Sequence, residues 1–94
     1  MRAFEKGVEL WDGEMNRIYG ELMKQLSPDG REALKVSQRA WLAWRDSQAR
    51  LLQETYGRAS GTMYRPMAVA HAMETVKART LQLRRYFEIV ETSR

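Results

Sequence analysis

The 94-residue sequence contains no cysteine, one histidine and two prolines. The lack of cysteine excludes disulfides, thiolate catalysis and cysteine-ligated zinc, and a single histidine excludes a metal site built from several imidazoles. No apolar stretch approaches the roughly 18 residues that a membrane-spanning helix needs. The first residues also lack the apolar segment of a signal peptide, so we expect either a cytosolic protein or an exported one whose leader precedes the given sequence.

The charges are unevenly distributed along the chain. Sixteen basic and twelve acidic residues give a formal net charge of +4, and residues 57–94 contain seven of the basic and three of the acidic ones. Such an excess allows weak attraction to polyanions, but charges that alternate in sign along a helix face are more typical of solvated surface. The hydrophobic fraction of 44% is ordinary for a soluble globular protein.

Apolar residues recur in steps of three and four along three segments, which is the spacing of amphipathic helices. No alternation typical of strands and no internal repeat competes with this pattern. We therefore predict an all-α protein, a three-helix up-down-up bundle with short connections, in which residues 1–94 form a single domain. The stripes consist of Phe4, Val8, Trp11, Met15, Ile18, Leu22 and Leu26, then Leu34, Ser37, Trp41, Trp44, Gln48, Leu51 and Leu52, then Pro66, Val69, Met73, Val76, Thr80, Leu83, Phe87 and Val90.

Two short breaks separate the predicted helices. In the sequence SPDG, Ser27 suits an N-cap and Pro28 a first helical turn. In the sequence GRASGT, Gly57 is expected to end the second helix, and Ser60 or Thr62 to cap the third. The predicted helices span about residues 3–26, 28–56 and 64–91.

The stretch QRAWLAWRD, residues 38–46, mixes tryptophan with charged side chains. At about 100° per residue, Trp41 and Trp44 both fall on the apolar stripe of the second helix, so we expect them to point inward. The opposite face holds a candidate exposed contact surface, which consists of Arg39, Asp46 and Arg50.

Arg45 departs from this division because it falls at the edge of the buried stripe, about 40° from Trp41. On the first helix, Asp12, Asn16 and Tyr19 flank the apolar stripe. If Arg45 projects toward that flank, Asp12 is placed to accept a charge-assisted hydrogen bond, and the other two to complete a polar network. Such a network would fix the register of the helices; the alternative is that these residues contact a ligand directly.

Catalysis and nucleic-acid binding receive little support. The sequence has no nucleophile motif and no metal-ligand spacing, and His71 falls about 160° from Met73, which is typical of a surface imidazole. Four basic residues lie close together on the third helix, namely Lys77, Arg79, Arg84 and Arg85. They fall at both edges of the stripe instead of forming one row. We therefore expect a non-enzymatic protein without metal or other cofactor, and we disfavour nucleic acid as its partner.

Three sequence blocks and one break occur in an order that resembles a known family. The blocks are DGEMNRIYGELM (12–23), QRAWLAWRD (38–46) and KARTLQL (77–83), and the break is GRASGT (57–62). Together they resemble the bacterial lysozyme-inhibitor LprI N-terminal domain family. Its pattern runs D-x-x-L-N-x-x-Y-x-x-L, then Q-R-x-W-x-x-x-R-D, then a Gly-rich turn and a T-x-x-R segment. The resemblance covers nearly the whole chain.

The resemblance assigns nine signature positions, which are Asp12, Asn16, Tyr19, Gln38, Arg39, Trp41, Arg45, Asp46 and Arg79. Met15 stands where the pattern usually has leucine, and Thr75 lies four residues before Arg79 instead of three. Family members typically carry a cysteine three positions after the R-D pair and a second one further on. The corresponding positions here are Ala49 and the vicinity of His71, so the resemblance implies that one disulfide is missing as a unit.

The resemblance also implies an exported protein, so we expect a periplasmic or secreted location, with a cytoplasmic one as the alternative. We expect a non-enzymatic protein that binds another macromolecule of the bacterial envelope. Lysozyme inhibition is the first alternative, although common lysozymes are strongly cationic and a +4 chain gains no long-range steering toward them. The second alternative is a basic helical module that binds nucleic acid or an anionic surface. The sequence leaves the oligomeric state open.

Overall fold

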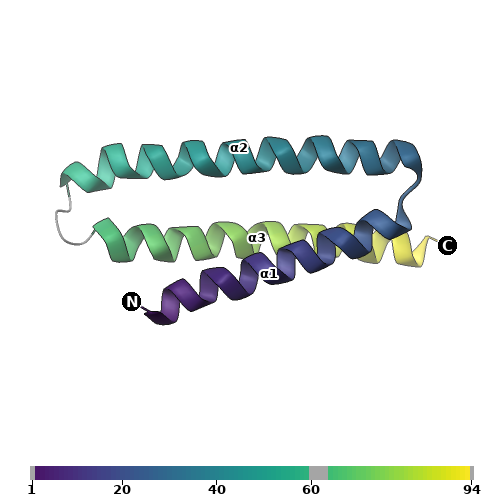
Figure 1. Ribbon diagram of the computed structural model, residues 1–94, viewed down its shortest axis with the longest axis horizontal. Helices are drawn as coiled ribbons and strands as arrows, with labels where there is room; N and C mark the ends of the chain where they lie inside the picture. The colour runs from purple at the N-terminus through teal and green to yellow at the C-terminus, as the bar shows by residue number, and fades with distance from the viewer. Residues whose placement is uncertain (1, 60–63, 94) are drawn as a thin grey trace.

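Three α-helices make up the described part of the chain, which is residues 2–59 and 64–93 of a computed structural model. Helix α1 spans Arg2–Gln25, α2 spans Pro28–Ala59 and α3 spans Tyr64–Thr92. The helices run lengthwise beside one another, with α2 antiparallel to α1 and α3 (Figure 1), in a body of 51 × 24 × 15 Å. The predicted all-α, three-helix up-down-up arrangement is confirmed.

The two helix breaks behave differently from each other. At the first, the Gly30 N–H donates to Ser27 Oγ at 3.2 Å and the Arg31 N–H donates to the Ser27 carbonyl at 2.8 Å, so Ser27 is the N-cap that the sequence predicts. The expected stop at Gly57 is wrong, because α2 continues to Ala59. Glycine within a helix lowers the stability of that helix by only about 1 kcal/mol relative to alanine. One glycine is therefore not enough to end a helix as long as α2. The expected caps Ser60 and Thr62 lie outside the described residues.

The principal packing interface joins the first and last helices. Helix α1 packs mainly against α3, whereas α2 makes far fewer contacts with either helix. Among the described residues, the buried hydrophobic side chains are Met15, Ile18, Leu22, Leu34, Val76 and Leu83. Thr80 is fully buried beside them, and its hydroxyl donates to the Val76 carbonyl at 2.8 Å and lies 3.4 Å from the Trp11 carbonyl. The one polar group at the centre of this interface is therefore satisfied.

An ionic contact reinforces the same interface at its surface. The Glu14 carboxylate of α1 accepts hydrogen bonds from Arg17 Nη2 at 2.6 Å and Nε at 3.0 Å, and from Arg84 Nη2 of α3 at 3.1 Å. Hydrogen bonds from Arg17, followed by those from Arg84, lower the pKa of Glu14 below its ordinary value of 4.5. The carboxylate thus holds its charge while it joins α1 to α3.

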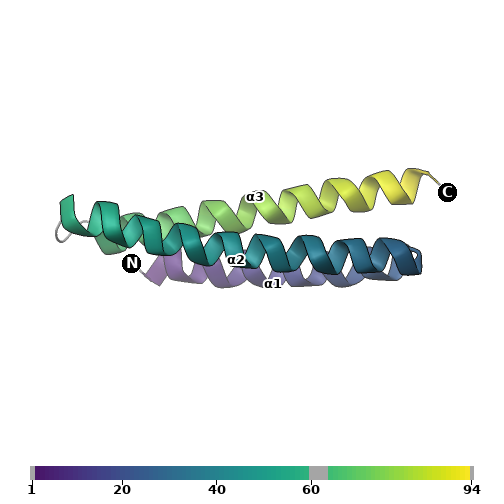
Figure 2. The same ribbon diagram turned by 90° about the horizontal axis from the view of Figure 1, so that it is seen from above.

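Helix α2 is covered along a narrower strip than its sequence predicts. Leu34 is buried and Trp41 is half-buried, but Trp44 is 48% exposed and Leu51 is 54% exposed. The expectation that both tryptophans point inward is therefore wrong for Trp44. The reason is geometric: α2 contacts α3 along one strip and hardly touches α1, so the rest of its surface has no neighbour among the described helices. Figure 2 also shows α2 and α3 separating toward the end of α3, beside the first turns of α2.

Replacement of Leu83 by alanine tests the dominance of the α1–α3 interface. Because Leu83 is 0% exposed, Leu83→Ala should lower the free energy of unfolding by about 2–5 kcal/mol, as truncation of a buried leucine leaves a cavity. The matched control is Leu81→Ala on the same helix, where the side chain is 44% exposed and the expected change is within about 0.5 kcal/mol. Urea denaturation followed by circular dichroism measures both. Equal losses at the two positions would contradict the packing described.

The Glu14 contact predicts a defined pH dependence. Because the pKa of Glu14 is lowered in the folded protein, its contribution to stability is present above pH 4.5 and is lost as the pH falls through the folded-state value. Glu14→Gln should therefore have a lower melting temperature than the parent protein at neutral pH, and this difference should vanish in acid. Glu32→Gln, which removes an exposed carboxylate of α2, is the control. A difference that persists unchanged at about pH 3 would show that the charge of Glu14 is irrelevant.

Candidate functional site

A buried arginine lies where α2 meets α3. Arg79 of α3 is only 6% exposed. Its guanidinium donates to three neutral acceptors: Nε to Gln38 Oε1 at 3.1 Å, Nη2 to Ser37 Oγ at 3.0 Å and Nη1 to Gln82 Oε1 at 2.5 Å. No carboxylate of the described residues forms an ion pair with it. Desolvation lowers the pKa of Arg79, because burial disfavours the charged form, yet an arginine remains a cation in a protein.

Trp41 contacts two guanidinium groups. The centre of its ring lies 6.0 Å from Arg79 Cζ and 5.2 Å from Arg45 Cζ. An indole face attracts cations through its quadrupole, and the attraction grows when the cation is desolvated. Trp41 therefore supplies part of the stabilisation that a carboxylate would otherwise give to Arg79.

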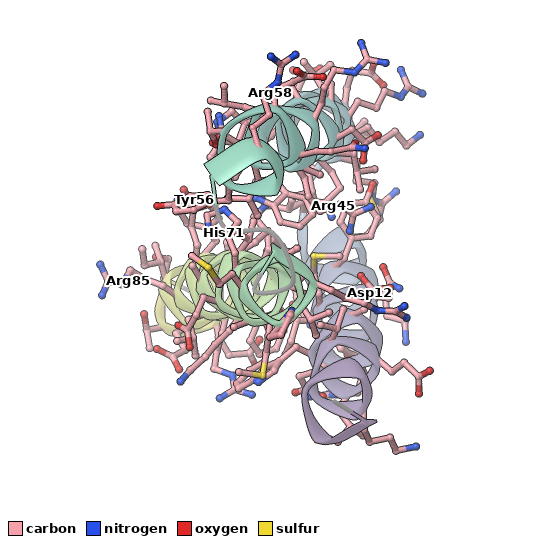
Figure 3. The ribbon with its side chains drawn as sticks, turned by 90° about the vertical axis from the view of Figure 1, so that its left-hand side faces the viewer. Asp12, Arg45, Tyr56, Arg58, His71 and Arg85 are labelled. Carbon is pink, nitrogen blue, oxygen red and sulfur yellow. The ribbon has the colours of Figure 1, made fainter. Side chains whose placement is uncertain are left out.

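Arg45 extends this cluster from α2 to α1. Its Nη1 lies 3.6 Å from Asp12 Oδ1 and its Nε lies 3.9 Å from Asp46 Oδ1. Figure 3 shows the Arg45 and Asp12 side chains on the same side of the molecule, with Arg85 projecting from the other side. The side chains of Arg45 and Asp12 are 34% and 44% exposed, so this is a partly solvated ion pair and not a buried one.

Six of the nine signature positions form one connected cluster, which we call the arginine–tryptophan cluster: Asp12, Gln38, Trp41, Arg45, Asp46 and Arg79. The Gln38 amide also lies 3.6 Å from the sulfur of Met15, so the cluster reaches α1 a second time. The other three positions lie outside it. Asn16 and Arg39 are exposed, and Tyr19 packs against the core. The expected polar network is therefore wrong in part, because neither Asn16 nor Tyr19 forms a side-chain hydrogen bond to the Asp12–Arg45 pair within the described residues.

The cluster borders two hollows between α2 and α3. The larger one, of about 520 Å³, is lined by Trp41, Trp44, His71, Glu74, Thr75, Ala78, Arg79 and Gln82. The smaller one, of about 60 Å³, is lined by Arg45, Gln48, Ala49, Leu52, Ala68, His71, Ala72 and Thr75. Ala49, which the resemblance places at one cysteine position of the family, and His71, near which it places the other, line the same cavity. His71 is exposed, as its place on the helix predicts, and lines both hollows.

Of the four basic residues that lie close together on α3, three have a partner within the protein. Arg79 is buried, Arg84 binds Glu14, and Lys77 Nζ lies 5.8 Å from the ring centre of Trp11. Of the four, only Arg85 projects freely from the described surface. Arg84 keeps 43% of its side chain exposed, but it and Lys77 already have partners, so a polyanion meets one unengaged cation among these four.

Sequence reasoning missed the central position of Arg79 and the role of Gln82. The signal for Arg79 was present in the spacing: Arg79 lies three residues after Val76 and four before Leu83, which are the steps of the buried stripe itself. The partner Gln82 gave no comparable signal, since it is an exposed residue that only its contact with Arg79 distinguishes.

Fold and site together define a small all-α domain whose polar signature residues mainly tie its helices to one another. Among the described residues no helix has a stretch long and apolar enough to cross a membrane, and no three acidic or histidine side chains gather as a metal site would require. A protein-family model described as "Lysozyme inhibitor LprI" matches residues 2–83. The chain therefore belongs to the LprI family. No curated protein and no solved structure matches it at a significant level.

Removal of the Gln38 amide tests the buried arginine. Gln38→Leu leaves the Arg79 guanidinium with one acceptor fewer in a desolvated place, so we expect a loss of about 2–4 kcal/mol in the free energy of unfolding. The matched control Gln53→Leu, at an exposed position of the same helix, should change it by less than about 0.5 kcal/mol.

The double variant Gln38→Leu, Arg79→Met completes the cycle for this pair. Its loss in the free energy of unfolding should be smaller than the sum of the losses of the two single variants by at least about 1 kcal/mol, because no buried charge remains without an acceptor. Additive losses in urea denaturation would show that Gln38 and Arg79 act independently.

Proposed function

We propose that this protein acts without catalysis, by stoichiometric binding of a protein in the bacterial envelope, and that a lysozyme is the partner to test first. The observation that carries the proposal is the family match over residues 2–83, since the family is described as one of lysozyme inhibitors. An exported location, periplasmic or secreted, follows from the same proposal, with a cytoplasmic one as the alternative.

The arrangement of polar groups supports a binding role over a catalytic one. Arg79 donates to neutral acceptors of its own chain, and the partly exposed carboxylates Asp12 and Glu14 face arginines. Catalysis by an acid or base requires a group aimed at a cleft where a substrate can reach it. These groups are instead committed to contacts between helices.

The proposed contact surface is the outer face of α2, formed by Arg39, Asp46 and Arg50. All three side chains are exposed, and neither Arg39 nor Arg50 forms an ion pair with another described residue. An arginine whose fork-shaped guanidinium is unpaired can form bidentate contacts with a partner's carboxylates. This surface therefore suits local recognition of acidic groups on a protein whose overall charge is positive.

Two other partner classes remain as alternatives. A different envelope protein fits the same exposed surface of α2 equally well. Nucleic acid or an anionic surface is less favoured, because Arg79, Arg84 and Lys77 are occupied within the fold and affinity for phosphates grows with the number of free cations.

A titration of lysozyme activity with this protein tests the proposal. We expect saturable inhibition near one equivalent, which persists at physiological salt because long-range steering contributes little between two cationic proteins. One animal-type lysozyme and one bacterial muramidase should be compared. The absence of inhibition for both at high micromolar protein would contradict lysozyme as the partner.

A charge-matched pair of variants locates the contact. Arg39→Glu with Arg50→Glu should weaken inhibition by at least about tenfold, as loss of two close charge pairs across an interface does. The control is Lys24→Glu with Arg58→Glu, which changes the net charge equally at exposed positions elsewhere. If the two double variants lose the same inhibition, net charge and not the proposed surface governs binding.

A further inference from the structure

The larger hollow between α2 and α3 has the composition of a ligand site. Its volume of about 520 Å³ falls within the range of roughly 300–1,000 Å³ typical of small-molecule pockets. The indoles of Trp41 and Trp44 contribute from α2, and Arg79 and Gln82 from α3. Trp44 keeps 48% of its surface exposed, so part of its indole is accessible to a molecule that enters the hollow.

The cation at this hollow has no ion-pair partner among the described residues. Arg79 is one of its lining residues, and its guanidinium has five N–H groups, of which the described residues accept three. Each of the two terminal nitrogens therefore has one N–H for which the described residues provide no acceptor. All three acceptors are neutral, although a buried cation is normally paired with an anion. Ser37, Gln38 and Gln82 fix the plane of the guanidinium but leave its charge uncompensated.

The other titratable groups facing the hollow come from α3. Glu74 and His71 both line it and both are exposed, and the α2 side contributes only the two tryptophans. Glu74 forms no ion pair with Arg79 or with any other described residue. The Glu74 carboxylate at the rim therefore repels an anion that enters the hollow.

We propose that this hollow binds a small carboxylic acid, whose carboxylate takes the two vacant N–H groups of Arg79 and whose body lies against Trp41 and Trp44. A carboxylate matches the fork of a guanidinium in shape and charge, and charge-assisted hydrogen bonds of this kind are about twice as strong as neutral ones. The aromatic walls accept a flat body, either an aryl ring or the apolar face of a sugar ring. This binding goes beyond the contact with a protein proposed above, because it uses the other face of α2.

Paired acids and neutral analogues test the proposal on the full chain. Benzoate is compared with benzamide, and glucuronate with glucose, by two-dimensional NMR of the Arg79 Nε–H and the Trp44 indole N–H. We expect saturable shifts of both signals with at least one acid and none with its neutral analogue. Preference for benzoate assigns the ligand to the aryl acids, and preference for glucuronate assigns it to the sugar acids. No shift with either acid, or equal shifts with acid and neutral analogue, overturns the proposal.

Two variants separate binding from folding. Arg79→Met should abolish the shift of Trp44 if it keeps the helical circular dichroism of the parent, and unchanged binding by a folded Arg79→Met protein overturns the proposal. Glu74→Gln, at an exposed position, should tighten binding of the acid by about threefold, since it removes a like charge at the rim. Glu54→Gln, which makes the same change of charge on α2 outside the hollow, should leave the affinity unchanged. Equal affinities of the Glu74→Gln and Glu54→Gln proteins would show that the bound carboxylate does not lie near the Glu74 rim, which overturns the proposed site.

Discussion

The burial of one guanidinium without an acidic partner is the constraint on which the contact between α2 and the rest of the fold depends. Arg79 needs acceptors from α2, and Gln38 and Ser37 provide them only if α2 lies at one height and one rotation relative to α3. Trp41 then falls close to Arg79, and Arg45 reaches Asp12 of α1. An apolar seam alone would tolerate sliding by a turn, whereas these directional bonds do not.

The same constraint brings most of the signature residues into contact with one another. Asp12, Gln38, Trp41, Arg45 and Arg79 come from three helices and meet in one place. A domain of this size has little apolar surface to bury, so polar contacts of high directionality carry much of its specificity. Most of the signature positions thus join the helices to one another, whereas Arg39, which is also a signature position, is exposed on the outer face of α2.

The sequence predicts the positions of the helices well, but it predicts less well which surface of each helix is covered by another helix. Stripes at helical spacing locate all three helices and the cap at Ser27, because those features depend on residues close together in the chain. The exposure of Trp44 could not be predicted, since a helical wheel gives the width of an apolar stripe but not how much of it a neighbour covers. The spacing of Arg79 within the apolar stripe predicts that it is buried, whereas its charge predicts that it is exposed. Arg79 is buried because residues of α2 provide hydrogen-bond acceptors for it, and those acceptors are known only from the tertiary structure.

The pairing of the first helix with the last has a consequence for how the chain folds. The contact from Glu14 to Arg84 spans 70 residues, and that from Trp11 to Thr80 spans 69. Helical bundles usually fold fast because consecutive helices meet first, at low contact order. Here the main interface closes a loop that contains all of α2, so the conformational entropy of that loop must be lost before the core forms. On a ribosome, α1 would therefore meet its partner only after α2 and most of α3 had emerged.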